Sequence, residues 1–180
     1  LHTRIETDLT GLADSPIRTW TTTFTYYNPG TDTAVAQMIV DGPRTAVDDT
    51  TITDYSPMGY ITKVTNNALC LTTDYQSHNN RGQPGRIIDF NGKKIDLTYP
   101  PRGWLDAIVQ DVGGLNAVTD LDYDNVGQLT GTTLADGVHV DFRFDVAHRL
   151  YEVENGLGEI IKYELDAAGN QDKILYKTNA

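Results

Sequence analysis

The densest group of residues that could do chemistry is an acidic run of Asp120, Asp122 and Asp124, with one residue between each pair. Carboxylates at this spacing begin a calcium-binding loop of the EF-hand kind. The later positions break that pattern, because the sixth is Asn125 instead of Gly and the twelfth is Gly131 instead of Glu. We therefore expect Asp120 and Asp122 on a solvated strand face and Asp124 in a turn.

The remaining candidates for catalysis or metal binding are scattered, and they are His2, His78, His139, His148 and Cys70. The histidines have no metal-ligand spacing, and no nucleophile, zinc or phosphate-loop motif occurs. A lone histidine on a polar strand face is expected to be solvated, and Cys70 is expected to be a small buried side chain. No pair of carboxylates is singled out for glycoside hydrolysis. The sequence thus predicts no catalytic residue, no cofactor and no metal, and a protein that is not an enzyme.

Charge and composition narrow the class of protein. The net charge of −11 disfavours nucleic acid and anionic membranes as partners, because both require a positive patch. No apolar run approaches the roughly 18 residues that a spanning helix needs, so membrane insertion is not expected. Abundant Thr, Val, Ile and Tyr, with 16 Gly and 7 Pro scattered along the chain, favour an all-β fold of short strands and tight turns.

A repeat of about 21 to 24 residues organises the chain. Residues 123–129 align with 144–150 and 165–171, in the order aromatic or Leu, Asp, two variable residues, Gly, a variable residue and Leu. The same frame persists upstream in 55–61 and 99–105, where the Asp is lost and the spacing is kept. The residues of this structural motif are Tyr55, Gly59, Tyr99, Gly103, Tyr123, Asp124, Gly127, Leu129, Phe144, Asp145, His148, Leu150, Asp166 and Gly169.

The motif is typical of a tight turn. Asp favours the first place of a type I turn, where its carboxylate can accept a backbone N–H, and Gly favours the fourth. Gly127 is expected to be left-handed and to close a hairpin with a G1 bulge. His148 replaces the Gly of the motif in one copy. This predicts the weakest turn of the repeat, because a side chain at that position is strained.

A second turn signal lies between consecutive copies of the motif. The dipeptides Asn91-Gly92, Asp136-Gly137 and Asn155-Gly156, with Asn66-Asn67 and Gly113-Gly114 in equivalent places, are of the kind that connects hairpins. One repeat is therefore predicted to hold two strands of roughly seven residues each, about 23 Å long.

The strands that enter the motif alternate between apolar and polar residues, most clearly over 138–144, 95–99 and 161–165. One face of the sheet is therefore expected to be apolar. Residues at the aromatic position should cover the turn ends, with Ile61, Leu105, Leu129 and Leu150 packed opposite them. Residues 1–54 are expected to form degenerate, irregular hairpins and 55–180 regular ones, within one continuous domain.

This block of linked copies resembles the Rhs/YD-repeat family, the shell-forming repeats of bacterial polymorphic toxins. The resemblance implies an array of antiparallel β-hairpins in a twisted, curved sheet, a segment of a β-spiral shell. The implied function is a non-catalytic scaffold that encapsulates a C-terminal toxin, in a protein that is secreted or at the cell surface. The implied partners are the remainder of the shell, the encapsulated toxin and secretion-system components.

The family's Asp-Pro-x-Gly autocleavage motif is missing, which predicts that this is a fragment of a larger shell. An alternative function is a surface-exposed β-repeat module that binds glycan or protein. Such a module would present aromatic side chains to solvent. Trp104 and Tyr60 are the residues on which that alternative depends.

Overall fold

The computed structural model describes residues 2–8, 18–26, 34–44 and 46–178, and every regular element within them is a β-strand. The described part of the chain contains no helix long and apolar enough to cross a membrane. The all-β prediction is confirmed, and so is the antiparallel hairpin array.

The chain divides into two compact units, residues 1–94 and 95–180. The first unit holds β1 (His2–Asp8), β2 (Arg18–Tyr26), β3 (Val35–Asp41), β4 (Thr51–Tyr55), β5 (Ile61–Asn66), β6 (Leu71–Gln76) and β7 (Arg86–Ile88). The second holds β8, which begins on the boundary (Lys94–Thr98), β9 (Ala107–Gln110), β10 (Ala117–Tyr123), β11 (Leu129–Thr133), β12 (His139–Phe144), β13 (Leu150–Asn155), β14 (Ile160–Leu165) and β15 (Gln171–Lys177).

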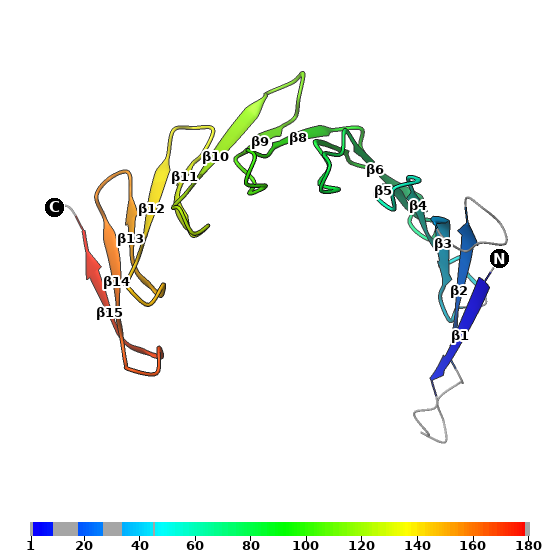
Figure 1. Ribbon diagram of the computed structural model, residues 1–180, viewed down its shortest axis with the longest axis horizontal. Coiled ribbons are helices and arrows are strands. Elements are labelled where there is room, and N and C mark those ends of the chain that lie inside the picture. Colours follow the sequence, from blue (N-terminus) through cyan, green and yellow to red (C-terminus); the bar gives the residue numbers. More distant parts are fainter. Residues whose placement is uncertain (1, 9–17, 27–33, 45, 179–180) are drawn as a thin grey trace. The chain divides into compact units, whose positions relative to one another are not determined.

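Within each unit the strands lie side by side in chain order, each antiparallel to the next, as the colour sequence of Figure 1 shows. Consecutive strands are therefore paired as in hairpins, and the described connections alternate between the two edges of the unit. Parts of the predicted irregular region 1–54 lie outside the described residues. The predicted change of regularity at residue 55 and the single continuous domain both stay predictions.

In three hairpins the aromatic position of the motif lies at the last pair, where the register shifts by one residue. Tyr123 pairs with Leu129 and Phe144 with Leu150. Tyr55 pairs with Ile61 in the same way. The shift is the bulge that a left-handed fourth turn residue introduces, and it brings the two apolar side chains opposite each other.

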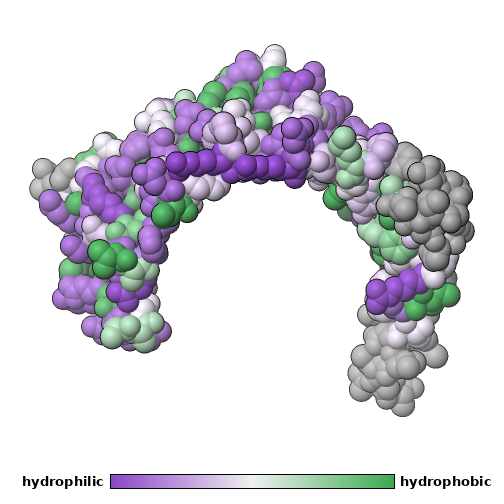
Figure 2. Space-filling view, in the orientation of Figure 1, coloured by the Kyte–Doolittle hydropathy of each residue, from purple (hydrophilic) through white to green (hydrophobic). Residues whose placement is uncertain are grey.

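As far as the described residues go, each unit is a single layer of sheet, without a second layer packed on it. No hydrophobic side chain among the described residues is buried, and the side chains of the apolar face are half-buried. Hydrophobic residues reach the surface among hydrophilic ones in both units (Figure 2). In β10 the predicted alternation holds, with Asp120 and Asp122 exposed and Leu121 and Tyr123 half-buried. Backbone pairing and contacts between neighbouring side chains therefore stabilise the array in place of a core.

Cys70 departs from its predicted burial. The thiol is exposed, and the residue has a φ of +52° at the end of the turn between β5 and β6. Its N–H donates to the Asn67 carbonyl at 3.1 Å, so Cys70 is the fourth residue of a turn and not part of a strand. Of its apolar neighbours Leu69 and Leu71, only Leu71 belongs to a strand.

Candidate functional site

Six turns along one edge carry the repeated motif, and we call them the anchor turns. In each, the N–H of the anchor residue donates to the carbonyl of the residue three positions earlier, at 2.8 to 3.4 Å. The anchors are Gly59, Gly82, Gly103, Gly127, His148 and Gly169, with φ values from +62° to +95°. This geometry requires the left-handed conformation, which Gly adopts without the strain that a Cβ brings.

The Asp that opens an anchor turn binds the backbone of that turn. Asp124 Oδ1 accepts hydrogen bonds from the N–H groups of Val126, Gly127 and Gln128, each at 2.9 Å. Asp145 Oδ1 accepts from Ala147 and Arg149 in the next turn, at 2.8 and 3.0 Å. These bonds satisfy N–H groups that the bulge leaves without a strand partner.

These hydrogen bonds stabilise the ionised carboxylates. The backbone N–H of Gln128 is the main cause that lowers the pKa of Asp124 below its ordinary value. Bonds from the Arg149 backbone and then its side chain lower the pKa of Asp145, and the Asn170 side chain does the same for Asp166. A general acid needs a raised pKa, so these three carboxylates are unsuited to that role at neutral pH.

Among the turns along the opposite edge, which we call the return turns, those that follow β5, β7, β11 and β13 have the same geometry. Gly92 N–H donates to Asp89 O at 2.9 Å and Gly137 N–H to Leu134 O at 2.9 Å. The prediction that Asn155-Gly156 forms the next return turn is wrong in detail. Asn155 opens the turn and Gly158, with a φ of +78°, closes it. Asn155 Oδ1 accepts from two backbone N–H groups, as the Asp of an anchor turn does.

In four places the residue directly after an anchor lies over the next anchor, and we call it a covering residue. A Cβ added to Gly82 would lie 2.8 Å from the Tyr60 ring, and one added to Gly127 would lie 2.8 Å from Trp104 Cζ2. Tyr60 also donates its hydroxyl to Asn80 O at 3.2 Å. Each of these glycines therefore serves two purposes: its backbone is left-handed, and its missing side chain leaves room for a ring.

Polar covering residues follow in the second unit. Gln128 donates its amide to His148 O at 3.1 Å, and its Oε1 lies 2.7 Å from His148 Nδ1. Arg149 donates to Asp166 O at 3.0 Å, and its Cδ lies 3.6 Å from where a Cβ on Gly169 would be. The one anchor with a side chain is therefore also the one whose covering residue bonds to that side chain.

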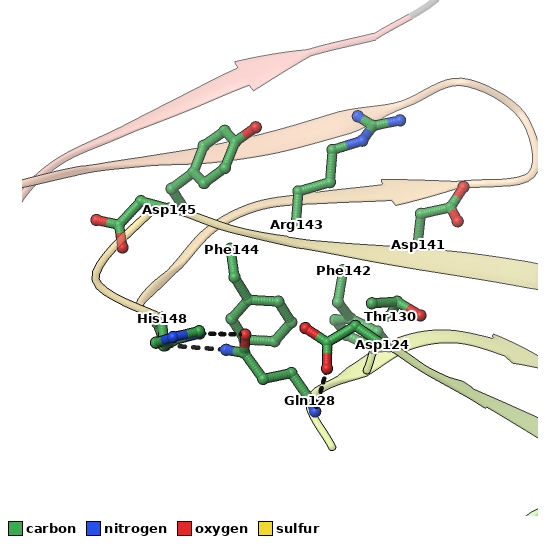
Figure 3. A pocket seen from close by; sticks show the side chains of 10 residues that line it. Asp124, Gln128, Thr130, Asp141, Phe142, Arg143, Phe144, Asp145 and His148 are labelled. Carbon is green, nitrogen blue, oxygen red and sulfur yellow. Dashed lines mark hydrogen bonds between the residues drawn. The ribbon is translucent and has the colours of Figure 1, made fainter. Parts of the chain in front are cut away.

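An open hollow of about 560 Å³ lies where two anchor turns meet β12. Its lining includes Asp124, Gln128, Phe144 and His148, and Figure 3 shows Gln128 reaching His148 across it. The polar groups at its mouth already bond to one another or to turn backbone. The hollow is a consequence of the turn-to-turn contact and offers little free donor or acceptor chemistry to a ligand.

His139 is not simply solvated, contrary to the prediction for a lone histidine. Its Nδ1 lies 2.8 Å from Thr133 Oγ1 and its Nε2 lies 3.2 Å from Asp141 Oδ1. The ring is also near Gly131, where an added Cβ would lie 3.3 Å from Cε1. The sequence could not show this contact, because Thr133 lies on the other strand of the hairpin. Within the described residues, no three His, Cys, Asp or Glu side chains gather as a metal site.

The motif residues lie mainly in the anchor turns and at the strand ends that flank them. Tyr55, Tyr123 and Phe144 end strands, Leu129 and Leu150 begin them, and Tyr99 directly follows β8. Partial burial raises the pKa of the Tyr99 hydroxyl. Sequence reasoning missed the covering residues. The signal available for them was a large side chain one place after an anchor, and pairing it with the next anchor requires knowing which turns are neighbours.

Comparison with known proteins supports the fold alone. No protein-family model matches the sequence, and no curated protein does. Crystal structures of TcdB2-TccC3 complexes match with a TM-score of 0.60. The complex with Cdc42 is 14% identical over 89% of this chain, and the one without the hypervariable C-terminal region is 14% identical over 99%. The chain spans 11% of the length of those chains. Its hairpin array is thus like part of a chain in the TcdB2-TccC3 structures.

Proposed function

We propose that this chain is a non-catalytic structural scaffold, a segment of an Rhs/YD-repeat shell that encapsulates a C-terminal toxin. The observation that carries the proposal is the single-layer array of hairpins whose anchor turns lock to one another through covering residues. An array of this kind forms a wall, because each repeat contacts its neighbours and both sheet faces stay free. Its likeness to TcdB2-TccC3 structures supports the toxin context.

The polar chemistry of the edge supports a scaffold over an enzyme. Asp124 and Asp145 use their oxygens to hold turns, and Asp145 Oδ2 also binds Arg149 at 2.7 Å. The glycan-binding alternative is weakened in the same way. Tyr60 and Trp104 pack on the next anchor turn instead of presenting a free platform. As a shell segment, the chain would act in a bacterial protein that is secreted or at the cell surface. The rest of the shell, the toxin and secretion-system components would be its partners.

The test uses the polypeptide in which this sequence occurs, purified from its source. Electron microscopy should show a hollow particle with density inside, and the enclosed segment should resist protease. Gly127→Val should open the wall, because a β-branched residue is forced to positive φ beneath Trp104. The enclosed segment should then be digested, whereas the exposed turn substitution Val126→Thr should leave it protected. A solid particle, or a cargo that is equally sensitive in all three proteins, would refute encapsulation.

A further inference from the structure

Two Asn-Gly dipeptides occur in the sequence, and both lie in return turns. They are Asn91-Gly92, between β7 and β8, and Asn155-Gly156, between β13 and β14. An asparagine loses its side-chain amide most readily when Gly follows it, because no Cβ then shields the next backbone nitrogen. The two pairs occupy different positions in their turns, and their reactivity differs for that reason.

We infer that Asn91-Gly92 is a site of spontaneous modification, at which Asn91 is converted to aspartate and isoaspartate, whereas Asn155-Gly156 is protected by its turn. The reaction needs only this chain and water, so the inference does not depend on the proposed scaffold role.

The chemistry is an attack of the backbone on a side chain. The Gly92 nitrogen gives up its proton to solvent and forms a bond to Cγ of Asn91, which closes a five-membered succinimide ring. The bond from Cγ to the carboxamide nitrogen breaks, and that nitrogen takes a proton from water and leaves as ammonia. Water then opens the ring at one of its two carbonyl carbons. One opening gives aspartate, and the other gives isoaspartate, in which the main chain runs through the former side chain.

Asn91 is the third residue of its turn, and its carboxamide is free to react. Its own N–H donates to Asp89 Oδ1 at 2.8 Å, and the Gly92 N–H donates to Asp89 O at 2.9 Å. The side chain of Asn91 is exposed and makes no hydrogen bond with the described part of the chain. The carboxamide can therefore rotate toward the Gly92 nitrogen, and only the hydrogen bond from Gly92 to Asp89 has to open.

Asn155 is the first residue of its turn, and its carboxamide is held at both ends. Oδ1 accepts from the N–H groups of Leu157 and Glu159, each at 3.0 Å, and Nδ2 donates to Glu159 Oε2 at 2.7 Å. The Gly156 N–H donates across the sheet to His139 O at 2.8 Å. Ring closure at Asn155 would require all of these hydrogen bonds to open.

The difference between the two sites is large enough to measure. Each hydrogen bond that has to open slows ring closure by about two- to tenfold, on the usual net strength of such bonds. Asn155 holds three bonds more than Asn91. Asn91 should therefore convert roughly tenfold or more faster than Asn155 in the folded protein.

Conversion changes the turn in which Asn91 lies. Asp89 Oδ1 accepts from the Lys93 N–H at 2.8 Å as well as from Asn91. Aspartate at position 91 adds a negative charge close to this carboxylate. Isoaspartate adds a carbon to the main chain between the two N–H groups that Asp89 binds, and so disturbs their spacing. The return turn after β7 should consequently be less stable once it is modified.

Peptide mapping by mass spectrometry tests the inference on the purified polypeptide in which this sequence occurs. Samples taken during storage in mildly alkaline buffer show the replacement of the side-chain NH₂ by OH at each Asn, and electron-transfer fragmentation separates aspartate from isoaspartate. Asn91 should convert at least about tenfold faster than Asn155 in the folded protein. In guanidinium chloride, where the turns are unfolded, the two should convert at similar rates.

A variant in the protected turn adds a second arm. Glu159→Ala removes the acceptor of Asn155 Nδ2 and should speed conversion at Asn155 by about two- to tenfold, with Asn91 in the same molecule as the reference. Asp172→Ala removes an exposed carboxylate from β15 and should change neither rate. Equal rates at the two pairs in the folded protein would overturn the inference. So would an Asn91 that converts only in guanidinium chloride, or an Asn155 that Glu159→Ala leaves unchanged.

Discussion

The Trp104 indole lies over Gly127 of the next anchor turn, and a Cβ on that glycine would come within 2.8 Å of Cζ2. The ring also lies beside Tyr123, with ring centroids 5.4 Å apart. Asn125, two residues before Gly127, is fixed as well, because Arg102 donates to its carbonyl at 3.2 Å. One repeat thus determines which residue the next one can place at its anchor.

The first prediction follows from comparing two left-handed glycines. Gly127→Ala should lower the free energy of unfolding by about 2–4 kcal/mol, from left-handed strain and overpacking against Trp104. Gly137→Ala is the matched control, since Gly137 has a φ of +83° and nothing within 4 Å of an added Cβ. It should cost only the strain, about 1–2 kcal/mol. Urea unfolding measures both, and in a Trp104→Ala background the difference should shrink. A difference that persists there would contradict the covering contact.

The second prediction concerns His148, whose imidazole is bonded by Gln128. His148→Gly should be near neutral, because relief of about 1 kcal/mol of strain offsets a lost hydrogen bond of similar size. In a Gln128→Ala background the same substitution should stabilise by about 1 kcal/mol, since only the relief remains. The urea unfolding midpoints of the wild type, the two single variants and the double variant test this prediction. Equal effects in both backgrounds would mean that Gln128 does not compensate for the strain.

The third prediction is an acid transition that depends on the anchor turns. Because the folded pKa values of Asp124, Asp145 and Asp166 lie below the unfolded value of about 3.9, their stabilisation is complete above that value. It should be lost as the pH falls below about 4 through the folded pKa values.

The matching variant replaces the three carboxylates by Asn, which keeps an acceptor oxygen and removes the charge, as Asn155 does in its own turn. It should be less stable than the wild type at pH 7 and lose less stability between pH 5 and pH 2. Urea midpoints across this range measure the slope, and Asp120→Asn with Asp122→Asn on the exposed face is the control. Parallel slopes for wild type and triple variant would exclude the turn carboxylates as the cause.

The fourth prediction concerns His139, which the sequence led us to expect in solvent and which is hydrogen-bonded in the structure. The ring bonds Thr133 and Asp141, so its loss in His139→Ala should lower the free energy of unfolding by about 0.5–1.5 kcal/mol. Thr133→Val should cost a similar amount, and the double variant should cost less than the sum. Strict additivity of the two substitutions would show that the hydrogen bond contributes nothing.

The fifth prediction tests whether the repeat is the unit of folding. Deleting residues 128–148 removes one whole repeat and joins Gly127 to Arg149, so Arg149 takes the covering position that Gln128 has after Gly127. It should keep its strand signal in circular dichroism and melt cooperatively. Deleting residues 128–138 removes half a repeat and moves all later turns to the other edge, so this variant should aggregate or unfold. Similar behaviour of both deletions would argue against a repeat of two strands.

The sequence predicted the turns and strands, which depend on residues within one repeat. The spacing of Asp124 and Gly127 gives the turn, and the alternation around Phe142 and Phe144 gives the strands, because both depend on neighbours along the chain. The contact of Trp104 with Gly127 could not be predicted in this way, since it joins two repeats. Of the two glycines 156 and 158, the sequence could not identify the one that closes the return turn, because both follow Asn155 within three residues.

The covering contacts also follow the order in which the chain is synthesised. In every case the covering side chain precedes the residue that it covers, as Tyr60 precedes Gly82 and Arg149 precedes Gly169. During synthesis on the ribosome, each new hairpin therefore meets a finished strand edge and a side chain already in place above its own turn. Because the strand contacts among the described residues join consecutive strands, the hairpin array can form one hairpin at a time as the chain emerges.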